Sequence, residues 1–349
     1  MIQTDVLIIG AGPVGLFTVF EAGLLNLKCH LIDSLPYPGG QCAEIYPKKP
    51  IFDIPAWPEI LAENLVENLL TQIEPFQPSY TLGERAESLE KDEEDHFIIT
   101  TREGTRHRSK VVIIAGGLGS FEPRKPPIPE LGQFENKGVD YFIKVPEKYN
   151  NKKVVISGGG DSALDWTIHL ADIAEQLTLI HRRNEFRGAQ ESVRKVRDLA
   201  EKGKIELITH AEVIGLNGAT RLNELNVKAD SSEFRIEADY FLPLFGLLPK
   251  LGPIGDWGLE IEKNAIRVHN AYDYSTNIRG IYAVGDVNIY PGKLKLILSG
   301  FHEATLALQS AYKIIHPGKK HVMKYTTVNG ITGFDGSKKE AKKVEATAI

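Results

Sequence analysis

The sequence is poor in cysteine. Its 349 residues include two cysteines, Cys29 and Cys42, which lie 13 positions apart and form no C-x-x-C pair. Two cysteines are too few for a disulfide framework or for a zinc site built on cysteine ligands. The ten histidines show no regular ligand spacing, so the sequence predicts no metal site.

The sequence also has no excess of positive charge and few long hydrophobic runs. The net charge is −5, and no basic stretch with interleaved aromatic residues is present, which argues against a nucleic-acid partner. The most apolar region, residues 6–25, contains four glycines, a proline and Glu21, so it does not suit a membrane span. The N-terminus lacks the basic start of a secretory signal. We therefore expect a soluble, cytoplasmic protein that is long enough for two domains.

A glycine-rich motif follows an apolar stretch at the start of the chain. We expect residues 2–9 to form one buried parallel strand, because most of them are apolar. In a dinucleotide-binding loop, the first glycine makes the turn, the second admits a pyrophosphate and the third lets the helix pack on the strand. Backbone N–H groups at the helix start then hold the phosphates. The sequence GAGPVG predicts such a loop, made by Gly10, Gly12, Pro13 and Gly15.

An acidic residue ends the next expected strand. Residues 28–32 form an apolar stretch that leads to Asp33, 18 positions after Gly15. A carboxylate at this place can accept hydrogen bonds from both ribose hydroxyls, and it would repel a 2′-phosphate. The first loop is therefore expected to bind FAD or NAD.

The chain contains a second loop of the same kind. The β-forming residues 153–157 lead into GGGDSA, in which Gly158, Gly160 and Ala163 have the dinucleotide spacing. A helix to about Glu175 and a strand at 177–180 are expected to follow. We assign to this loop Gly158, Gly159, Gly160, Asp161 and Ser162.

Cations replace the acid after the second loop. The strand ends in HRRNEFR, which places His181, Arg182, Arg183 and Arg187 where a 2′-phosphate would lie. Arginine binds phosphate with two parallel hydrogen bonds, and the acid that selects NAD is missing. We therefore expect NADP(H) at the second loop, and FAD at the first.

Two proline-rich crossings divide the chain. The apolar residues 110–119 lead to FEPRKPPIPE, and FLPLFGLLPKLGP crosses back at 241–253. Prolines stiffen such segments and stop helices. A further strand is expected within 279–287 and ends at Gly285 and Asp286, before a helix that begins at about Leu294.

These elements predict an α/β protein with two Rossmann-like (three-layer ββα) dinucleotide-binding domains. The FAD domain is expected at residues 1–117 and 246–349. The NADP(H) domain, residues 118–245, is expected to be inserted into it. The two crossings would allow hinge motion between the domains.

Along nearly its whole length the chain resembles the two-domain flavoprotein disulfide reductases, such as low-molecular-weight thioredoxin reductase. It shares with them, in the same order, the motifs GAGPVG, GGQ, GGGDSA, HRR and AVGD. One stretch departs from that family. Phe142 and Val145 stand where thioredoxin reductases have their two redox cysteines. The chain thus closely resembles the ferredoxin–NADP reductases of the thioredoxin reductase type, and the stretches that support this resemblance are IDSLPYPGGQ, FDIPAWPEI, GSFEPRK and DWGLEIEKN.

This resemblance implies roles for particular residues. Asp33 would bind the adenosine ribose, Gln41 and Asp286 would contact the flavin and its ribitol, and Tyr46 would stack on the isoalloxazine. A C-terminal extension from about residue 317 would cover the other flavin face, with Tyr325 as the stacking aromatic, and would cross to a second subunit, which implies a homodimer. Further FAD contacts are expected from Gly40, Ala86, Phe121, Gly285, Tyr325 and Thr327, with Thr326 beside the flavin.

The resemblance also implies an activity: electron transfer between NADPH and ferredoxin or flavodoxin, with FAD as the redox centre and no catalytic acid or base. The basic residues of 181–204 are a candidate docking face for an acidic ferredoxin, although a plain solvated face explains them equally well. Three alternatives stay open. They are an NADPH-dependent quinone or diaphorase-type reductase, a divergent thioredoxin reductase that uses Cys42, and a cofactor-binding protein without turnover.

Overall fold

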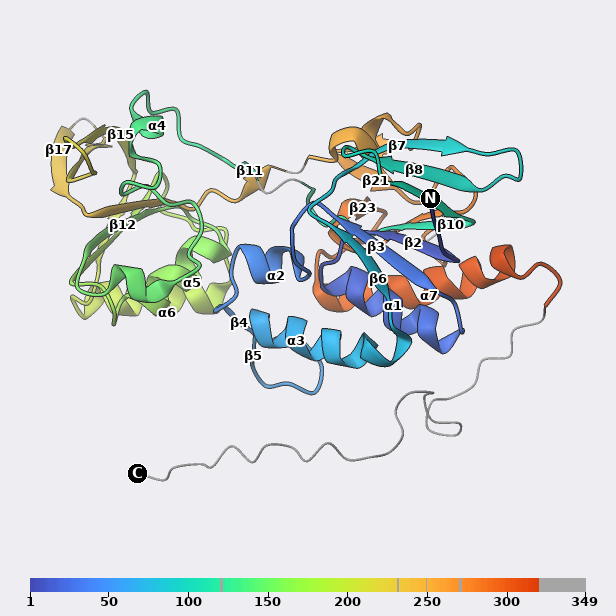
Figure 1. Ribbon diagram of the computed structural model, residues 1–349. Helices are drawn as coiled ribbons and strands as arrows, with labels where there is room; N and C mark the ends of the chain where they lie inside the picture. Colours follow the sequence, from blue (N-terminus) through green and yellow to red (C-terminus); the bar gives the residue numbers. More distant parts are fainter. Residues whose placement is uncertain (120–121, 231, 249, 270–271, 320–349) are drawn as a thin grey trace.

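The computed structural model describes residues 1–119, 122–230, 232–248, 250–269 and 272–319. Within them the chain forms two lobes, each with a parallel sheet, helices on one face and a smaller, mainly antiparallel sheet on the other (Figure 1). The predicted Phe121, Tyr325, Thr326 and Thr327 lie outside the described residues.

The first lobe is built on a five-stranded parallel sheet. Its order is β22 (Ile281–Ala283), β10 (Val111–Ile114), β2 (Val6–Ile9), β3 (Cys29–Asp33) and β6 (Ser79–Leu82). The central strands are buried along their length, which explains their continuous apolar sequence. The sheet joins β22, which follows the second crossing, to β10, which precedes the first.

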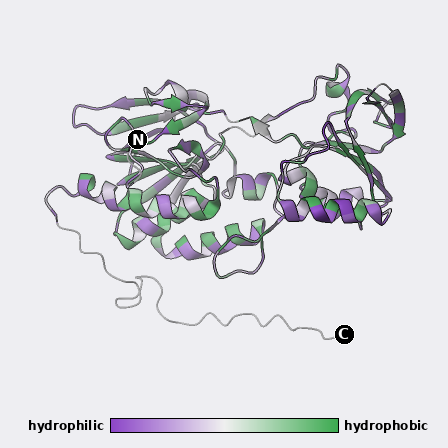
Figure 2. Ribbon diagram, turned by 180° about the vertical axis from the view of Figure 1, so that it is seen from behind, coloured by the Kyte–Doolittle hydropathy of each residue, from purple (hydrophilic) through white to green (hydrophobic). Residues whose placement is uncertain are grey.

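Helices cover one face of this sheet (Figures 1 and 2). They are α1 (Pro13–Leu24), α3 (Ala62–Ile73) and α7 (Ile297–Ile315), with the short helices α2 (Gly40–Glu44) and η1 (Glu74–Phe76) and the hairpin of β4 (Pro50–Ile51) and β5 (Ile60–Leu61) at their edge. In α3 the side chains of Leu65, Val66 and Leu69 are buried, whereas the opposite helix face is polar. This pattern is typical of an amphipathic helix that packs on a sheet.

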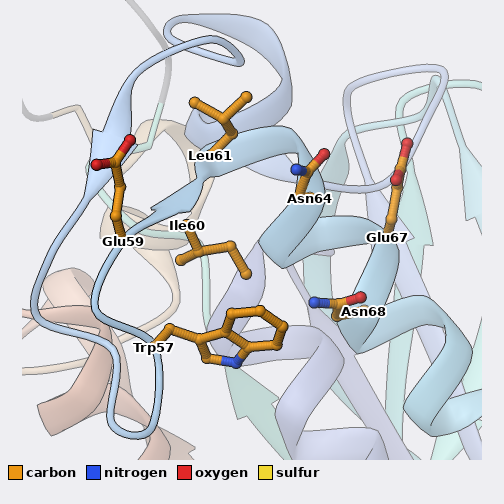
Figure 3. A pocket seen from close by; sticks show the side chains of 7 residues that line it. All are labelled: Trp57, Glu59, Ile60, Leu61, Asn64, Glu67 and Asn68. Carbon is orange, nitrogen blue, oxygen red and sulfur yellow. The ribbon is translucent and has the colours of Figure 1, made fainter. Parts of the chain in front are cut away.

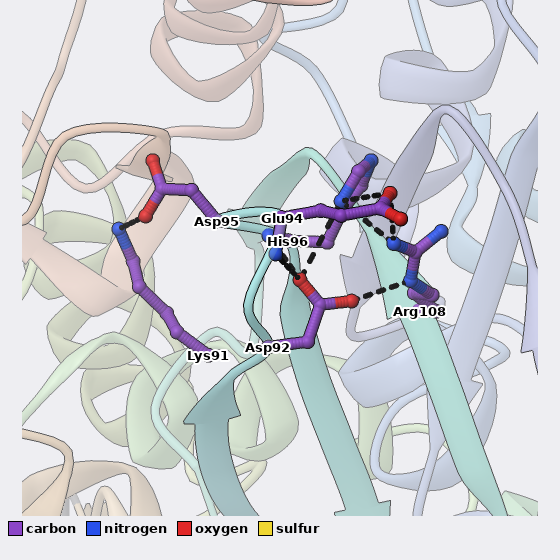
Figure 4. Close-up of polar contacts among 6 residues, drawn as sticks. All are labelled: Lys91, Asp92, Glu94, Asp95, His96 and Arg108. Carbon is purple, nitrogen blue, oxygen red and sulfur yellow. Dashed lines mark hydrogen bonds and ion pairs between the residues drawn. The ribbon is translucent and has the colours of Figure 1, made fainter.

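A second sheet covers the other face. Its strands are β1 (Ile2–Gln3), β9 (Arg106–Ser109), β8 (Phe97–Thr101) and β7 (Ala86–Lys91). The turn between β7 and β8 is held by the guanidinium of Arg108, which lies 2.6 Å from Asp92 and 2.8 Å from Glu94 (Figure 4). Nearby lie η3 (Gly252–Asp256), η4 (Gly285–Val287) and the small sheet of β20 (Ile261–Glu262), β21 (Ala265–Arg267) and β23 (Asn288–Ile289).

The expected single strand at 2–9 is wrong. β1 pairs in parallel with β9 at the edge of the four-stranded sheet, whereas β2 pairs with β10 and β3 in the five-stranded parallel sheet. The chain changes sheets at Thr4, whose hydroxyl donates to the Lys28 carbonyl at 2.8 Å, and at Asp5, whose carboxylate accepts from the Lys28 N–H at 2.8 Å. These polar contacts fix the step between the two layers.

The second lobe repeats the three-layer plan. Its parallel sheet runs β14 (Glu206–Thr209), β13 (Gln176–His181), β12 (Lys153–Ser157) and β18 (Tyr240–Pro243). Helices α5 (Asp161–Leu170) and α6 (Gln190–Glu201) cover one face, and β15 (Ala211–Asn217), β16 (Glu224–Ala229) and β17 (Ser232–Glu237) cover the other. The short helices α4 (Leu131–Phe134) and η2 (Pro146–Tyr149) complete it.

Alternate residues of β12 face the two outer layers. Val154 and Ile156 pack in the cluster that includes the helices, whereas Val155 packs in the cluster that includes the small sheet. Helix α5 ends at Leu170, earlier than the expected Glu175, and α7 begins at Ile297 instead of about Leu294.

The two crossings lie side by side. β11 (Glu122–Pro123) pairs antiparallel with β19 (Leu247–Leu248), and they connect the lobes (Figure 1). The two-lobed α/β architecture agrees with the predicted fold class. The boundaries at 117/118 and 245/246 stay a prediction.

Candidate functional site

The first glycine loop joins β2 to α1. Gly10 has φ +106°, and a Cβ there would lie 2.4 Å from the Ala115 carbonyl oxygen, so only glycine fits. A Cβ on Gly15 would lie 1.9 Å from the Gly10 oxygen, which explains why the helix can pack closely on the loop. Pro13 occupies the start of the helix, where its missing N–H costs no hydrogen bond.

Gly12 is not required by packing within the protein. A Cβ on Gly12 would have the Gly40 Cα as its nearest neighbour, at 3.8 Å. The space in front of Gly12 belongs to the adjoining cavity. A loop that is bare on the cavity side, with the free N–H groups of a helix start behind it, fits a pyrophosphate.

Asp33 is held in place at the end of β3. One carboxylate oxygen accepts from the Ala11 N–H at 2.6 Å, and the other accepts from the Leu35 N–H at 2.9 Å. Burial raises the pKa of this carboxyl, whereas the two N–H donors lower it. Each oxygen keeps a second lone pair, so the group can still accept a hydrogen bond from a ribose hydroxyl.

A cavity of about 530 Å³ lies along this edge of the sheet. Its wall includes the first glycine loop, Asp33 and residues that sequence analysis did not assign, among them Glu84, Arg85, Lys295 and Ile297. The structure brings to it the following predicted residues: Gly10, Gly12, Pro13, Asp33, Gly40, Gln41, Tyr46, Ala86, Gly285 and Asp286. Gly15 lies behind the loop. That these residues bind FAD stays a prediction.

The cysteines give no sign of a thiol redox site. Cys42 lines the cavity, with its sulfur 3.9 Å from the Tyr46 hydroxyl, and is buried. Burial raises the pKa of the Cys42 thiol to about 11, and burial also raises the pKa of Cys29. Both therefore stay protonated near neutral pH, and a thiol is a poor nucleophile compared with a thiolate.

The second glycine loop joins β12 to α5. A Cβ on Gly158 would lie 2.7 Å from the Leu244 oxygen, and one on Gly159 would enter the His181 ring at 2.1 Å. Gly160 has no heavy atom within 4 Å of a Cβ position, so the protein leaves its outer side open. The side chains of Asp161 and Ser162 are exposed beside it at the helix start.

His181 differs from the expectation. It is buried rather than exposed beside the arginines, stacks on Phe186 at 4.9 Å and lies beneath Gly159. Burial lowers its pKa, and the charges of Arg182, Arg187 and Arg183 lower it further. Neutral His181 therefore supports the loop, and the cations available to a phosphate are the exposed arginines.

Ion pairs join the two lobes next to the cavity. Lys49, which follows α2, lies 2.7 Å from Asp165 of α5. Lys144 of the second lobe lies 2.5 Å from Glu44, the last residue of α2. Gly40 and Gln41 of the same helix line the cavity. Helix α2 therefore contacts the cavity at one end and the second lobe at the other.

A second hollow, of about 440 Å³, lies between the β4–β5 hairpin and α3 (Figure 3). It is open to the surface and contains none of the predicted site residues. Its lining consists of Trp57, Glu59, Ile60, Leu61, Asn64, Glu67 and Asn68. Trp57 is 49% exposed there.

Two absences apply to the part of the chain that the structure describes. No helix in it is long and apolar enough to cross a membrane. No group of three or more His, Cys, Asp or Glu side chains in it could hold a metal ion.

Comparisons with known proteins identify the family. The family model for the pyridine nucleotide-disulphide oxidoreductases matches residues 4–311. The chain is 68% identical to ferredoxin–NADP reductase 2 of Christiangramia forsetii, over all of this chain and 99% of that one. It is 65% identical to the ferredoxin–NADP reductase of Flavobacterium johnsoniae over both full lengths, and 50% identical to that of Mesorhizobium japonicum over 94% of this chain and 95% of that one.

Solved structures confirm the fold. The thioredoxin reductase of Lactococcus lactis superposes with a TM-score of 0.77 at 24% identity, over 89% of this chain and 99% of that one. That of T. acidophilum also gives 0.77, at 23% identity over 90% of this chain and 99% of that one. The chain therefore belongs to the pyridine nucleotide-disulphide oxidoreductase family and, within it, to the ferredoxin–NADP reductases with a thioredoxin reductase-type fold.

Proposed function

We propose that this protein transfers electrons between NADPH and ferredoxin through a bound FAD. The observation that carries the proposal is the contrast between its two glycine loops. The first leads to the carboxylate of Asp33, which suits an unphosphorylated ribose, and the second leads to exposed arginines, which suit a 2′-phosphate. FAD and NADP(H) as cofactors also follow from the family to which the chain belongs.

The residues of the chain position the reaction. Residues 1–117 and 246–349 would form the FAD domain, and 118–245 the NADP(H) domain. Gly10, Gly12 and the start of α1 would hold the pyrophosphate, Asp33 the ribose, and Tyr46 one face of the ring. At the second loop, Gly158 to Ser162 would hold the other pyrophosphate, with Arg182, Arg183 and Arg187 at the 2′-phosphate.

The chemistry belongs to the cofactor, since FAD takes two electrons as a hydride and can release them singly to a one-electron acceptor. Hydride transfer requires donor and acceptor atoms about 3–3.5 Å apart. The two lobes of the protein would bring the nicotinamide and the flavin together. Electrons would then leave the flavin without passing through a pair of cysteines. Phe142 and Val145 occupy the positions of the redox cysteines, and the sulfurs of Cys29 and Cys42 are buried.

Ferredoxin is proposed as the acceptor because relatives bear that name. Flavodoxin as a second partner, a homodimer and a cytoplasmic location are part of the proposal. The basic residues of 181–204 that are not committed to the 2′-phosphate would present positive charge to an acidic partner.

An anaerobic assay tests the proposal. The purified protein is mixed with NADPH or with NADH while the flavin absorbance is followed, and oxidised [2Fe–2S] ferredoxin is then added. We expect NADPH to bleach the flavin much faster than NADH and the ferredoxin to become reduced. If NADPH bleaches the flavin but only quinones or dyes are reduced, the proposed cofactors stand and ferredoxin is ruled out as the partner. Binding of NADPH without bleaching would contradict an enzymatic role.

A further inference from the structure

A buried carboxylate lies directly behind the turn that carries Asp286. Glu303 comes from the second turn of α7 and has no exposed surface. It forms an ion pair with Lys293, whose side chain is 4% exposed. Two buried charges are costly unless their geometry is good and their other hydrogen-bonding groups are satisfied.

Glu303 satisfies these conditions with four donors. Its Oε2 accepts from the Gly285 N–H at 2.7 Å and from the Asn288 side-chain amide at 2.8 Å. Its Oε1 accepts from the Tyr290 hydroxyl at 2.8 Å and from the Lys293 ammonium. All four donors belong to one short segment, so a single side chain holds that segment to α7.

The same segment forms a wall of the cavity. Gly285 opens the turn η4 with φ +77°, and Asp286 lines the cavity next to it. Helix α7 approaches this turn so closely that a Cβ on Gly300 would lie 3.2 Å from the Gly285 Cα. The turn is thus fixed by packing from Gly300 and by a charged hydrogen bond from Glu303.

We propose that Glu303 is a positioning residue of the FAD site, which fixes the Gly285–Val287 turn and so presents the Asp286 carboxylate to the cavity. The inference rests on the proposed function, because it assumes that FAD occupies this cavity. A wall that is ordered before binding loses less conformational freedom when the ligand arrives, which increases affinity.

The variant Glu303→Gln tests this role with little change of shape. An amide has one NH₂ where the carboxylate has an acceptor oxygen. In one orientation the NH₂ faces the Gly285 and Asn288 donors, and in the other it faces Tyr290 and Lys293. In either orientation the amide NH₂ of the new side chain faces groups that are themselves hydrogen-bond donors. The positive charge of Lys293 also loses the negative charge that it pairs with.

The matched control is Ser310→Ala. Ser310 lies on the same helix, where its hydroxyl donates to Asp273 at 2.9 Å and accepts from Tyr282 at 3.1 Å. Neither Ser310 nor these partners line the cavity. Both variants remove polar contacts of α7, but only Glu303→Gln disturbs the cavity wall.

The measurement is FAD affinity, by titration of apoprotein with FAD, together with the Tm of the apoprotein and the flavin midpoint potential. We expect Glu303→Gln to weaken FAD binding about 10- to 100-fold, the range for loss of a hydrogen bond to a charged group, and to shift the potential. Ser310→Ala should lower the Tm of the apoprotein and leave both the affinity and the potential unchanged.

Lys293→Met gives a milder second variant if Glu303→Gln does not fold. It should also weaken FAD binding, and Glu303→Gln combined with Lys293→Met should bind FAD better than Glu303→Gln alone, because no unpaired charge remains. Unchanged FAD affinity with a lower Tm in the Glu303 and Lys293 variants would overturn the inference. A wild-type protein that binds no FAD would overturn the proposed function as well, so the two failures are distinguishable.

Discussion

The ammonium group of Lys49 lies 2.7 Å from the carboxylate of Asp165, and this ion pair joins the two lobes of the molecule. Asp165 also lies 3.2 Å from the hydroxyl of Ser192, so its side chain is held from two sides. The side chains are 25% and 34% exposed, which leaves them partly protected from screening by salt.

Reversal of one of these charges should loosen the contact between the lobes. Lys49→Glu would place two carboxylates together, and the double variant with Asp165→Lys would restore an attraction. We expect a change of about 0.5–1 kcal/mol in the equilibrium between closed and open arrangements, visible as a larger radius of gyration in small-angle scattering. Lys91→Glu is the control, because Lys91 pairs with Asp95 within the first lobe at 2.5 Å. An equal expansion in the control would refute the role of the Lys49 pair.

The exposed arginines after β13 should select the phosphorylated cofactor. Replacement of Arg182 and Arg183 by alanine should raise the KM for NADPH about 10- to 100-fold and leave that for NADH nearly unchanged, because a charged, bidentate contact to the 2′-phosphate is lost. Arg194→Ala is the control, since Arg194 already pairs with Glu191 at 2.8 Å. Steady-state flavin reduction with both nucleotides measures the effect. Equal losses for NADPH and NADH would argue against 2′-phosphate recognition.

Gly160 should matter to the nucleotide and not to the fold. A Cβ there meets no protein atom within 4 Å, so Gly160→Ala is expected to keep the Tm within about 1 °C while it weakens NADPH binding roughly tenfold through contact with the pyrophosphate. Gly132→Ala, at another position with open space, should change neither quantity. Calorimetric titration with NADPH measures both affinities.

Neither cysteine should be needed for turnover. Because burial raises the pKa of Cys42 to about 11 and also raises that of Cys29, the thiols are protonated at pH 8. Alanine at both positions should leave flavin reduction by NADPH and ferredoxin reduction within about twofold of the wild type, at a stability cost of about 1 kcal/mol each. Iodoacetamide at pH 8 should not inhibit the wild type. Loss of electron transfer in the double variant would revive the thioredoxin reductase alternative.

A buried pair of histidines should make the first lobe sensitive to acid. The rings of His30 and His107 lie 4.8 Å apart, and both hydrogen bond to the Thr81 hydroxyl, at 2.8 and 2.9 Å. Burial lowers the pKa of His30 from 6.5 to about 4 and lowers that of His107 as well. The unfolded chain therefore takes up protons first as the pH falls.

For this reason the free energy of unfolding should decrease as the pH falls from 6.5 to about 4. Above pH 6.5 these two histidines should not make it depend on pH. We expect a loss of about 1–3 kcal/mol in the free energy of unfolding between pH 8 and pH 4.5, measured with urea. His30→Gln should lower stability at pH 8 and flatten the pH dependence. His210→Asn, at an exposed position with φ +53° that asparagine tolerates, should leave the profile unchanged.

Local sequence patterns predicted the parts of the sites that depend on spacing within one βαβ unit. Gly10, Gly12 and Asp33 lie in one such unit, so the distance along the chain fixes their distance in space. The same holds for Gly158, Gly160 and Arg182. The change of sheet at Thr4 was missed, because the polar residues Gln3, Thr4 and Asp5 were included in one strand with the apolar residues that follow them.

Contacts between residues that are far apart in the sequence could not be predicted from such local patterns. Glu303 reads as an ordinary polar residue on a helix until the fold brings the turn at Gly285 against it. Lys144 and Glu44 are 100 positions apart, and no local pattern joins them. His181 was expected among exposed cations because its neighbours are, but strand alternation turns its ring inward, beneath Gly159.

The pairing of β11 with β19 gives the second lobe an entrance and an exit at adjacent points. A domain inserted in this way can be replaced by another domain of the same kind without a change in the topology of the domain that contains it. Because the second lobe is the proposed nucleotide-binding domain, exchange of this one segment would change the preference for a nucleotide while the first lobe keeps its sequence. This arrangement would let the nucleotide preference of the second lobe evolve separately from the cavity of the first lobe.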